Sequence, residues 1–355
     1  MKRQGNLFEK ICTLENLIYA EARVKKGKRS RLETSVFRLN LEANLLSLCE
    51  DLKSGTYKCD AYHVFNICDP KIRVIAAPSY RDRVVHHALC AVIEPIFDVG
   101  FDYDSYACRK GKGTHAAMTR LSQLLSSKDY VFQGDISKFF PSINHAVLKL
   151  LIRQRVKCKL TLVLCDRIID SACTLSNGAG KGLPIGNLTS QLFANIYLHA
   201  LDQFIRRRLP QLKYIRYCDD FILISLSKET LAVARSKIEV FLKSVLLLDL
   251  HAHKRRIYPA GEGISFLGFR HFAGGARRLL PANGHRFARR LRSINLKVSR
   301  GELSPPQATR RVESWRSHAS HGHTSALQHA LLSGNASEWA LGITARGSGR
   351  FLEQQ

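Results

Sequence analysis

The chain has 355 residues, of which 45% are hydrophobic, so it can fold around a core and an intrinsically disordered chain is excluded. Lys and Arg number 55 against 29 Asp and Glu, and the net charge of +26 predicts a polyanionic partner, with nucleic acid as the default. Charge alone leaves one alternative open, a generally basic enzyme.

Membrane and export signals are missing from the sequence. No apolar run approaches ~18 residues, so we expect no transmembrane helix and no membrane partner. The first residues, MKRQGNLFEKIC, lack the apolar core of a secretory signal peptide. The 10 cysteines are scattered without a Cys-x-x-Cys pair, which favours free thiols over a disulfide framework or a zinc ribbon. Together these features predict a cytoplasmic protein.

Helices and one hairpin are predicted for the N-terminal part of the chain. The first ~55 residues have amphipathic helical patterns on both sides of a basic cluster at 23–31. Residues 61–78 alternate as a β-hairpin does. Residues 79–97 predict a helix with Ser79 as its N-cap.

Strands and helices then alternate along the rest of the chain. The predicted elements are a strand at 130–140 that turns at Pro141, a glycine-rich loop at 177–191 leading into a helix, a strand–turn–strand at 216–225, a helix at about 228–247, a short β segment at 263–272 and a basic helical region over the last 75 residues. This order predicts an α+β fold with an antiparallel sheet backed by helices.

Two adjacent carboxylates lie inside the strand-like run RYCDDFILIS at 216–225. An unpaired buried carboxylate costs several kcal/mol, so Asp219 and Asp220 need compensation, and metal ions would provide it. Asp135, in the strand-like run FQGDISKFF, would complete a two-magnesium site for in-line displacement by a 3′-hydroxyl on a triphosphate. The alternative for a bare Asp-Asp pair is an ordinary Asx turn between strands.

Six segments, in the right order, resemble the motifs of reverse transcriptases. They are KIRVIAAPSYRDRVVHHAL (71–89), SYACRKGKGTHAA (105–117), DISKFFPSI (135–143), GLPIGNLTSQLFANIYL (182–198), YCDD (217–220) and HKRRIYPAGEGISFLGF (253–269). The resemblance implies a right-hand polymerase fold with fingers, palm and a helical thumb. It places N-terminal helices and fingers at 1–130, the palm at 131–275 with an inserted fingers segment at about 146–185, and the thumb and C-terminal tail at 276–355.

The loop IGNLTSQ at 185–191 resembles one subclass, the reverse transcriptases of diversity-generating retroelements, since most other reverse transcriptases have Gln-Gly and Ser-Pro there. This likeness implies a bacterial or phage enzyme that copies a template RNA into adenine-mutagenised cDNA. It also implies a small basic accessory protein that forms a ring. Two alternatives stay open: a retron or phage-defence reverse transcriptase, and a non-catalytic RNA-binding protein on a polymerase fold.

The resemblance assigns the catalytic and metal-binding roles. Asp135, Asp219 and Asp220 would hold two Mg²⁺ ions, with Mn²⁺ as a substitute, and Ile136 would offer its backbone carbonyl. Lys254 would protonate the leaving pyrophosphate.

Further residues are assigned to the incoming deoxynucleoside triphosphate. Lys71 and Arg73 would neutralise the triphosphate from a fingers hairpin, unless they belong to a solvated strand face. Phe140 falls where the family has a steric gate against ribose. A core position is its alternative, although strand alternation makes Phe139 the better core candidate.

The nascent base pair and the nucleic-acid backbone account for the remaining assignments. Ile185 and Gly186 would line the base pair, with Gln191 at the start of the following helix. Ile185 cannot form the hydrogen bond of a Gln, which would reduce discrimination against mispairs. The segment 286–300 is predicted as a basic helix along the RNA–cDNA duplex, with the contacts assigned to Arg286, Arg289, Arg290 and Arg292.

Overall fold

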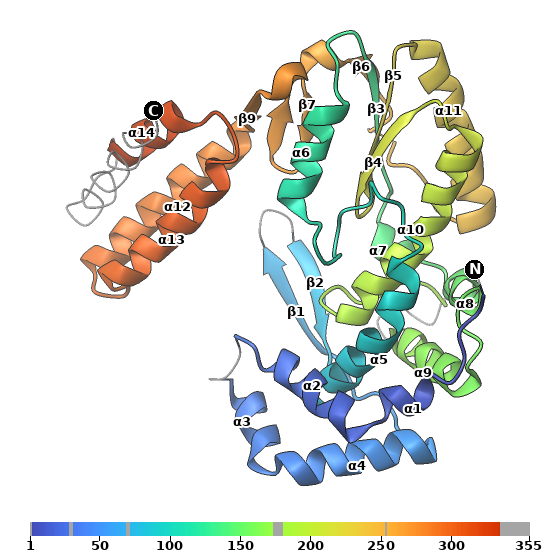
Figure 1. Ribbon diagram of the computed structural model, residues 1–355. Helices are drawn as coiled ribbons and strands as arrows, with labels where there is room; N and C mark the ends of the chain where they lie inside the picture. The colour runs from blue at the N-terminus through green and yellow to red at the C-terminus, as the bar shows by residue number, and fades with distance from the viewer. Residues whose placement is uncertain (1, 28–30, 69–71, 173–179, 253, 334–355) are drawn as a thin grey trace, which may run out of the picture. The chain divides into compact units, whose positions relative to one another are not determined.

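The computed structural model describes residues 2–27, 31–68, 72–172, 180–252 and 254–333 (Figure 1). The chain forms two compact units, one of residues 1–113, 132–223 and 229–256 and the other of residues 114–131, 224–228 and 257–355. They are called the first and second unit below. The boundaries drawn above between fingers, palm and thumb stay a prediction.

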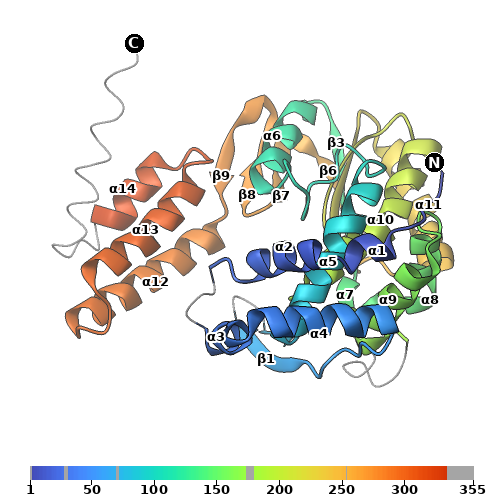
Figure 2. The same ribbon diagram turned by 60° about the horizontal axis from the view of Figure 1, so that its bottom comes forward.

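The first unit begins with helices, as the sequence predicts. They are α1 (Phe8–Ile11), α2 (Leu14–Val24), α3 (Leu32–Leu39) and α4 (Leu41–Ser54). The side chain of Thr13 caps α2 by accepting a hydrogen bond from the Asn16 backbone N–H. Helix α2 packs against α4 and against α5 (Tyr80–Asp98), and Figure 2 shows α2 lying above α4.

The predicted hairpin and the helix after it are confirmed. Strands β1 (His63–Cys68) and β2 (Ile72–Ala77) pair antiparallel, with Ile67 opposite Arg73. Ser79 caps α5, since its side chain accepts a hydrogen bond from the Asp82 backbone N–H. Helix α5 buries its apolar face. Because α5 begins three residues after the end of β2, this packing also anchors the end of the hairpin.

A four-stranded sheet has the strand order β4-β5-β3-β6. Its strands are β3 (Tyr130–Asp135), β4 (Lys213–Tyr217), β5 (Asp220–Ser225) and β6 (Ile257–Pro259). Gly134 makes room for Phe221 of β5, because a Cβ at 134 would lie 2.3 Å from the Cζ atom of that ring. Strands β3 and β5 therefore approach each other closely beside Asp135.

The first unit also contains further helices. They are α7 (Phe139–Ser142), α8 (His145–Arg153), α9 (Lys159–Asp170), α10 (Leu188–Arg208) and α11 (Lys228–Phe241), which continues as a π-helical turn, Leu242–Leu246. The predicted strand at 130–140 is too long: β3 ends at Asp135. Lys138 then takes a left-handed conformation with φ of 45°, which turns the chain into α7.

The second unit combines α6 (Thr114–Leu124) with a small sheet and a helical end. The sheet orders β7 (Ile264–Phe266), β8 (Phe269–His271) and β9 (Arg277–Leu279), and the helices are α12 (Pro281–Ser299), α13 (Pro305–Ala319) and α14 (Ser325–Ser333). The predicted β segment at 263–272 is thus a hairpin, with positive φ at Leu267 and Gly268. Phe287 and Trp315 stack at 3.6 Å between α12 and α13.

The α+β class predicted from the sequence is confirmed. In the described part of the chain the cysteines are unpaired, as predicted. Among the described residues, no helix combines the length and apolar character needed to span a bilayer.

Candidate active site

Two residues, Cys218 and Asp219, connect β4 to β5. Cys218 has a φ of 57°, a left-handed conformation that is uncommon for any residue other than glycine. The Arg216 guanidinium stabilises this turn from inside the protein by donating a hydrogen bond of 3.0 Å to the Cys218 carbonyl oxygen. The position of Asp219 and Asp220 therefore depends on a strained turn with a buried support.

That support is a fully buried ion pair between a strand and a helix. Arg216 donates from Nε to one carboxylate oxygen of Asp202 at 2.7 Å and from an Nη to the other at 2.6 Å, and both side chains have no exposed surface. The Tyr214 hydroxyl donates to the same carboxylate at 2.6 Å. Bidentate pairs of this kind fix geometry as well as charge. Asp202 on α10 thus anchors the β4–β5 turn.

The three predicted carboxylates belong to one electrostatic neighbourhood. Burial raises the pKa of Asp220 to about 6, with smaller upward contributions from the charges of Asp135 and Asp219, while Gln133 and Lys254 act against this rise. Burial also raises the pKa of Asp219, with the charge of Asp135 adding to the rise. The mutual repulsion shows that the structure brings together the three aspartates that the sequence singled out.

Two neutral or basic groups contact these carboxylates. The Gln133 Nε2 atom on β3 donates to an oxygen of Asp220 at 3.2 Å. Lys254 forms an ion pair in which its Nζ lies 3.0 Å from Oδ2 of Asp135. The Lys254 side chain is about half exposed at 48%, so solvent weakens this pair and the lysine can leave it at little cost.

The donor set fits a divalent cation by its chemistry. Carboxylate oxygens are the ligands that hard cations such as Mg²⁺ and Mn²⁺ take in proteins. The pKa values of Asp219 and Asp220 are raised by burial and repulsion, and a nearby cation would relieve both effects. Within the described residues, no three His, Cys, Asp or Glu side chains stand ready to enclose a metal ion. In this arrangement the Lys254 ammonium supplies the positive charge beside Asp135.

The candidate nucleotide-binding residues of the first unit lie on β2 and on the loop before α10. Arg73 is exposed on β2, while Lys71 lies outside the described residues. The backbone N–H of Ala76, at the end of β2, donates to the Ile185 carbonyl oxygen at 3.2 Å. Gly186 has a φ of 117°, and a Cβ there would lie 3.1 Å from Cγ2 of Ile75. The loop is therefore hydrogen-bonded to the end of β2. Arg73 lies on the same strand, about 10 Å from Ala76.

Phe139 and Phe140 stand on the short helix α7 and not on a strand. Phe139 is buried at 2% exposure, so its assignment to the core is confirmed, although the strand alternation behind that assignment is wrong. Phe140 is half-buried, and its carbonyl oxygen accepts a hydrogen bond of 2.9 Å from the Leu183 backbone N–H. This hydrogen bond places Phe140 beside the loop that carries Ile185. Its role as a steric gate stays a prediction.

Two more predicted residues have defined surroundings in the first unit. Gln191 is exposed near the start of α10 and lines a small hollow with Glu94 and Cys108. Ile136 is buried and forms an isolated antiparallel bridge with Leu250. Their roles toward the nucleotide and the metal remain predictions.

The predicted backbone-binding arginines lie on α12, in the second unit. This helix buries Phe287, Leu291 and Ile294 and leaves its basic face outward. Arg289, Arg290 and Arg292 are exposed, while Arg286 is half-buried and donates to the Asn283 side chain at 3.4 Å. The helix has the charge distribution of a surface that binds a polyanion.

Three residues of the site escaped the sequence-based prediction: Gln133, Asp202 and Arg216. A signal for Arg216 was present, because an arginine inside the apolar run of β4 and β5 must be paired if it is buried. Asp202 interrupts the apolar stripe of α10 in the same way. No sequence pattern predicts that Asp202 and Arg216 form a pair, since they meet only in the folded protein.

The chain is similar in sequence to known proteins. The family model described as reverse transcriptase (RNA-dependent DNA polymerase) matches residues 67–271. Protein YkfC of Escherichia coli (strain K12) is 26% identical over 278 residues, which are 66% of this chain and 73% of that protein. The group II intron-encoded protein LtrA of Lactococcus lactis subsp. cremoris is 24% identical over 296 residues, or 64% of this chain.

The chain spans 49% of the length of that intron-encoded relative. Among solved structures, the apo telomerase from Candida tropicalis superposes with a TM-score of 0.48 at 13% identity, over 68% of this chain and 53% of that chain.

Proposed function

Because the chain belongs to the reverse transcriptase (RNA-dependent DNA polymerase) family, we propose that Asp135, Asp219 and Asp220 carry out RNA-directed DNA polymerisation. Family membership confirms the predicted right-hand polymerase fold and the predicted enzyme class. The observation that supports the three residues is their convergence beside Lys254 within the matched region. A non-catalytic RNA-binding protein on this fold would have no need to retain three mutually repelling, partly buried acids.

The aspartates would hold divalent ions, and magnesium is the ion that we propose, with manganese as a substitute and the Ile136 carbonyl as a further ligand. When bound, such ions supply the charge that stabilises a triphosphate and activates a 3′-hydroxyl. Gln133 holds the Asp220 carboxylate in a fixed orientation. Lys254, now 3.0 Å from Asp135, would give its proton to the leaving pyrophosphate.

Substrate selection would come from the elements next to these acids. Arg73, with Lys71, would neutralise the triphosphate, and Phe140 would exclude a ribose 2′-hydroxyl. Ile185 and Gly186 would line the nascent base pair, with Gln191 behind them. This assignment is supported by the hydrogen bonds that join the loop to Ala76 on one side and Phe140 on the other.

Within the family, we assign the chain to the diversity-generating retroelement class, which makes adenine-mutagenised cDNA in a bacterium or phage. Ile185 carries this assignment, because its side chain offers no hydrogen bond to test the geometry of a base pair. A cytoplasmic ribonucleoprotein with a template RNA and a small basic ring-forming protein would follow. A retron or phage-defence reverse transcriptase is the alternative, and sequencing of cDNA made by the wild type decides between them by its errors at template adenines.

The decisive test of the site is primer extension on an RNA template with magnesium. Asp219→Asn removes a ligand charge without changing side-chain volume, so we expect loss of nucleotide addition with the circular dichroism spectrum unchanged. The matched control is Asp170→Asn, which removes a surface carboxylate that pairs with Lys149 and should extend like the wild type. Extension by Asp219→Asn at the wild-type rate would refute the assignment.

A further inference from the structure

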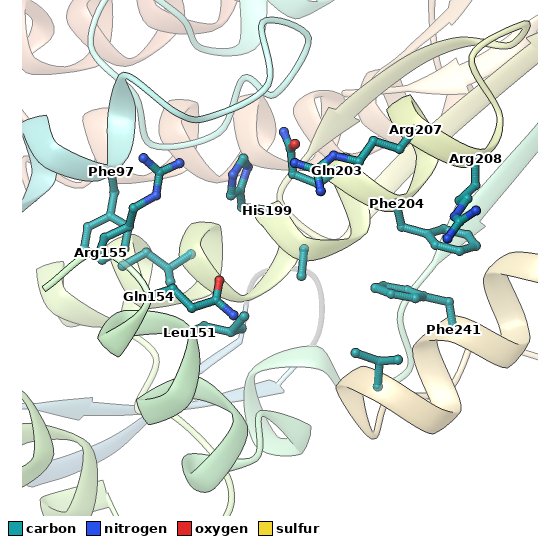
Figure 3. Close-up of a pocket in the computed structure, with 13 residues that line it drawn as sticks. Phe97, Leu151, Gln154, Arg155, His199, Gln203, Phe204, Arg207, Arg208 and Phe241 are labelled. Atoms are coloured by element: carbon teal, nitrogen blue, oxygen red, sulfur yellow. The ribbon is translucent and has the colours of Figure 1, made fainter. Parts of the chain in front are cut away.

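A basic hollow lies in the first unit, beside the C-terminal half of α10. It has a volume of about 460 Å³ and is lined by residues of α5, α8, α10 and the region of α11, together with Arg155 (Figure 3). Arg207 and Arg208 stand on its rim, and no Asp or Glu is among its lining residues. A neighbouring hollow shares Arg208 and adds Lys237, again without an acidic residue. Positive charge is thus concentrated on one face.

The two arginines on the rim have their charge available for an external anion. Their neighbour Arg206 is committed inside the protein, since it pairs with Asp102 at 2.6 Å and Asp104 at 2.9 Å. Arg207 and Arg208 are exposed, and neither forms an ion pair with any described residue. Cations in the last turn of a helix interact well with its dipole, but that effect requires no neighbouring hollow.

An aromatic pair joins the two hollows. The rings of Phe204 on α10 and Phe241 on α11 stack with centroids 4.3 Å apart and an interplanar angle of 15°. Both residues line both hollows and both are half-buried, so part of each ring faces outward. Figure 3 shows Arg208 extending beside this pair. Flat aromatic surface next to arginines is what proteins use to bind unpaired bases and their phosphates.

We propose that this surface, the Arg207–Phe204 pocket formed by Arg155, Phe204, Arg207, Arg208, Lys237 and Phe241, binds a single-stranded segment of RNA outside the template–primer duplex. The phosphates contact the arginines and a base stacks on the exposed part of the Phe204 ring. The basic accessory protein expected above would be repelled here. An acidic peptide would match the charge but would leave the aromatic surface unused.

The pocket is separate from the proposed active site. On α10, Arg207 lies sixteen positions after Gln191, which is about 24 Å along the helix. The substrate class rests on the proposed function, because RNA is the proposed template. The binding site itself stands on residues that take no part in nucleotide addition, so the two hypotheses can fail independently.

The test uses the full chain and a fluorescent oligouridine of about 20 nucleotides. The variant Arg207→Glu/Arg208→Glu should weaken binding about tenfold and lower the log–log salt slope by about 1.4, for two lost phosphate contacts. Its control, Lys10→Glu/Lys53→Glu, makes the same charge change at exposed residues in the last turns of α1 and α4. Both variants should extend a short primer–template at the wild-type rate when it is saturating.

Aromatic stacking is tested by Phe204→Leu, which keeps an apolar side chain and removes the flat ring. Binding should weaken by about fivefold or more while the salt slope stays the same. Photocrosslinking with 4-thiouridine should label the peptides that contain Phe204 or Phe241. Equal binding by the double variant and its control would overturn the proposal. It would also be overturned if polyglutamate, and not oligouridine, bound in an Arg207-dependent way, since that result would indicate a protein partner.

Discussion

Ile185 is a single apolar side chain at the point where the proposed polymerase would inspect a base pair. Its backbone is fixed by the hydrogen bond from Ala76, so a substitution should change the side chain without moving the loop. A glutamine there would gain a hydrogen bond that only a well-placed nucleotide satisfies, worth about 1 kcal/mol. Selectivity should therefore rise several-fold, about fivefold.

We predict that Ile185→Gln lowers misincorporation opposite template adenine more than opposite the other bases. The measurement is deep sequencing of cDNA made on one template by wild type, Ile185→Gln and the volume-matched control Ile185→Leu, which should behave like the wild type. If wild-type errors are no more frequent at adenine, the retroelement class is wrong. High adenine errors in all three proteins would keep the class and discard this mechanism.

Arg216 is a positioning residue, because it touches the turn that carries the aspartates and not the substrate. We predict that Arg216→Lys keeps the buried charge but loses the bidentate geometry and the bond to the Cys218 carbonyl. The kcat for nucleotide addition should fall about tenfold or more, while the KM for the deoxynucleotide changes little. Steady-state primer extension separates the two constants.

Arg206→Lys is the matched control for Arg216→Lys. It also breaks a bidentate pair between α10 and another segment, with Asp102, but it does not touch the β4–β5 turn. Urea unfolding should show that both variants lose stability, and only Arg216→Lys should lose kcat. A parallel loss of kcat in the two variants would mean that Arg216 acts through stability alone.

Among the helices and strands, the sequence predicts best those whose bounds depend on local interactions. Ser79 as a helix cap and the alternating pattern before it led correctly to the hairpin and α5. The sequence does not mark the end of β3, because Ile136 and Phe139 continue the apolar pattern past Asp135, and the change of direction comes from the left-handed turn at Lys138. Such turns at residues other than glycine leave no mark in a sequence.

The candidate site likewise combines residues that local sequence patterns predict with residues that they do not. The sequence surroundings of Asp135, Asp219 and Asp220 are specific enough to predict their role, and the structure brings the three into one electrostatic neighbourhood. The support by Asp202 and Arg216 depends on a helix packed on a strand, which no local pattern describes. The surroundings of Gln133 and the pocket at the end of α10 are likewise products of packing.

Helix α5 contains a buried histidine that should make the protein sensitive to acid. Burial lowers the pKa of His86 to about 3, with the charge of His87 adding to the effect, and neither ring nitrogen has a hydrogen-bond partner among the described residues. The unfolded chain takes up a proton below about pH 6.5, whereas the folded protein resists it. Stability is thus complete above pH 6.5 and is lost as the pH falls toward 3.

We predict that this histidine alone costs about 2 kcal/mol of unfolding free energy between pH 7 and pH 5. The variant His86→Leu should show a correspondingly smaller acid loss, since leucine fits an apolar site and binds no proton. Urea unfolding of both proteins at the two pH values measures the difference. If His86→Leu loses as much unfolding free energy between the two pH values as the wild type, another group causes the acid sensitivity.

At the scale of the whole molecule, a net charge of +26 makes binding to nucleic acid depend on salt. We predict that charge reversal of Arg289, Arg290 and Arg292 on α12 lowers the log–log salt slope for an RNA–DNA duplex by about 0.7–0.9 per lost contact. A reversal of Lys10, Lys53 and Lys58, exposed residues of the first unit, is the control for net charge. The same slope in both variants would exclude α12 from the duplex footprint.

Gly134 limits the amino-acid substitutions that this protein can tolerate beside the proposed active site. A methyl group at 134 would force the Phe221 ring to move by about 1 Å, because a Cβ there would lie 2.3 Å from the ring. Gly134 precedes Asp135 and Phe221 follows Asp220, so one added carbon would disturb carboxylates on two strands at once. Any side chain larger than that of glycine at 134 therefore requires a compensating change at Phe221, so the two strands are constrained to vary together at this point.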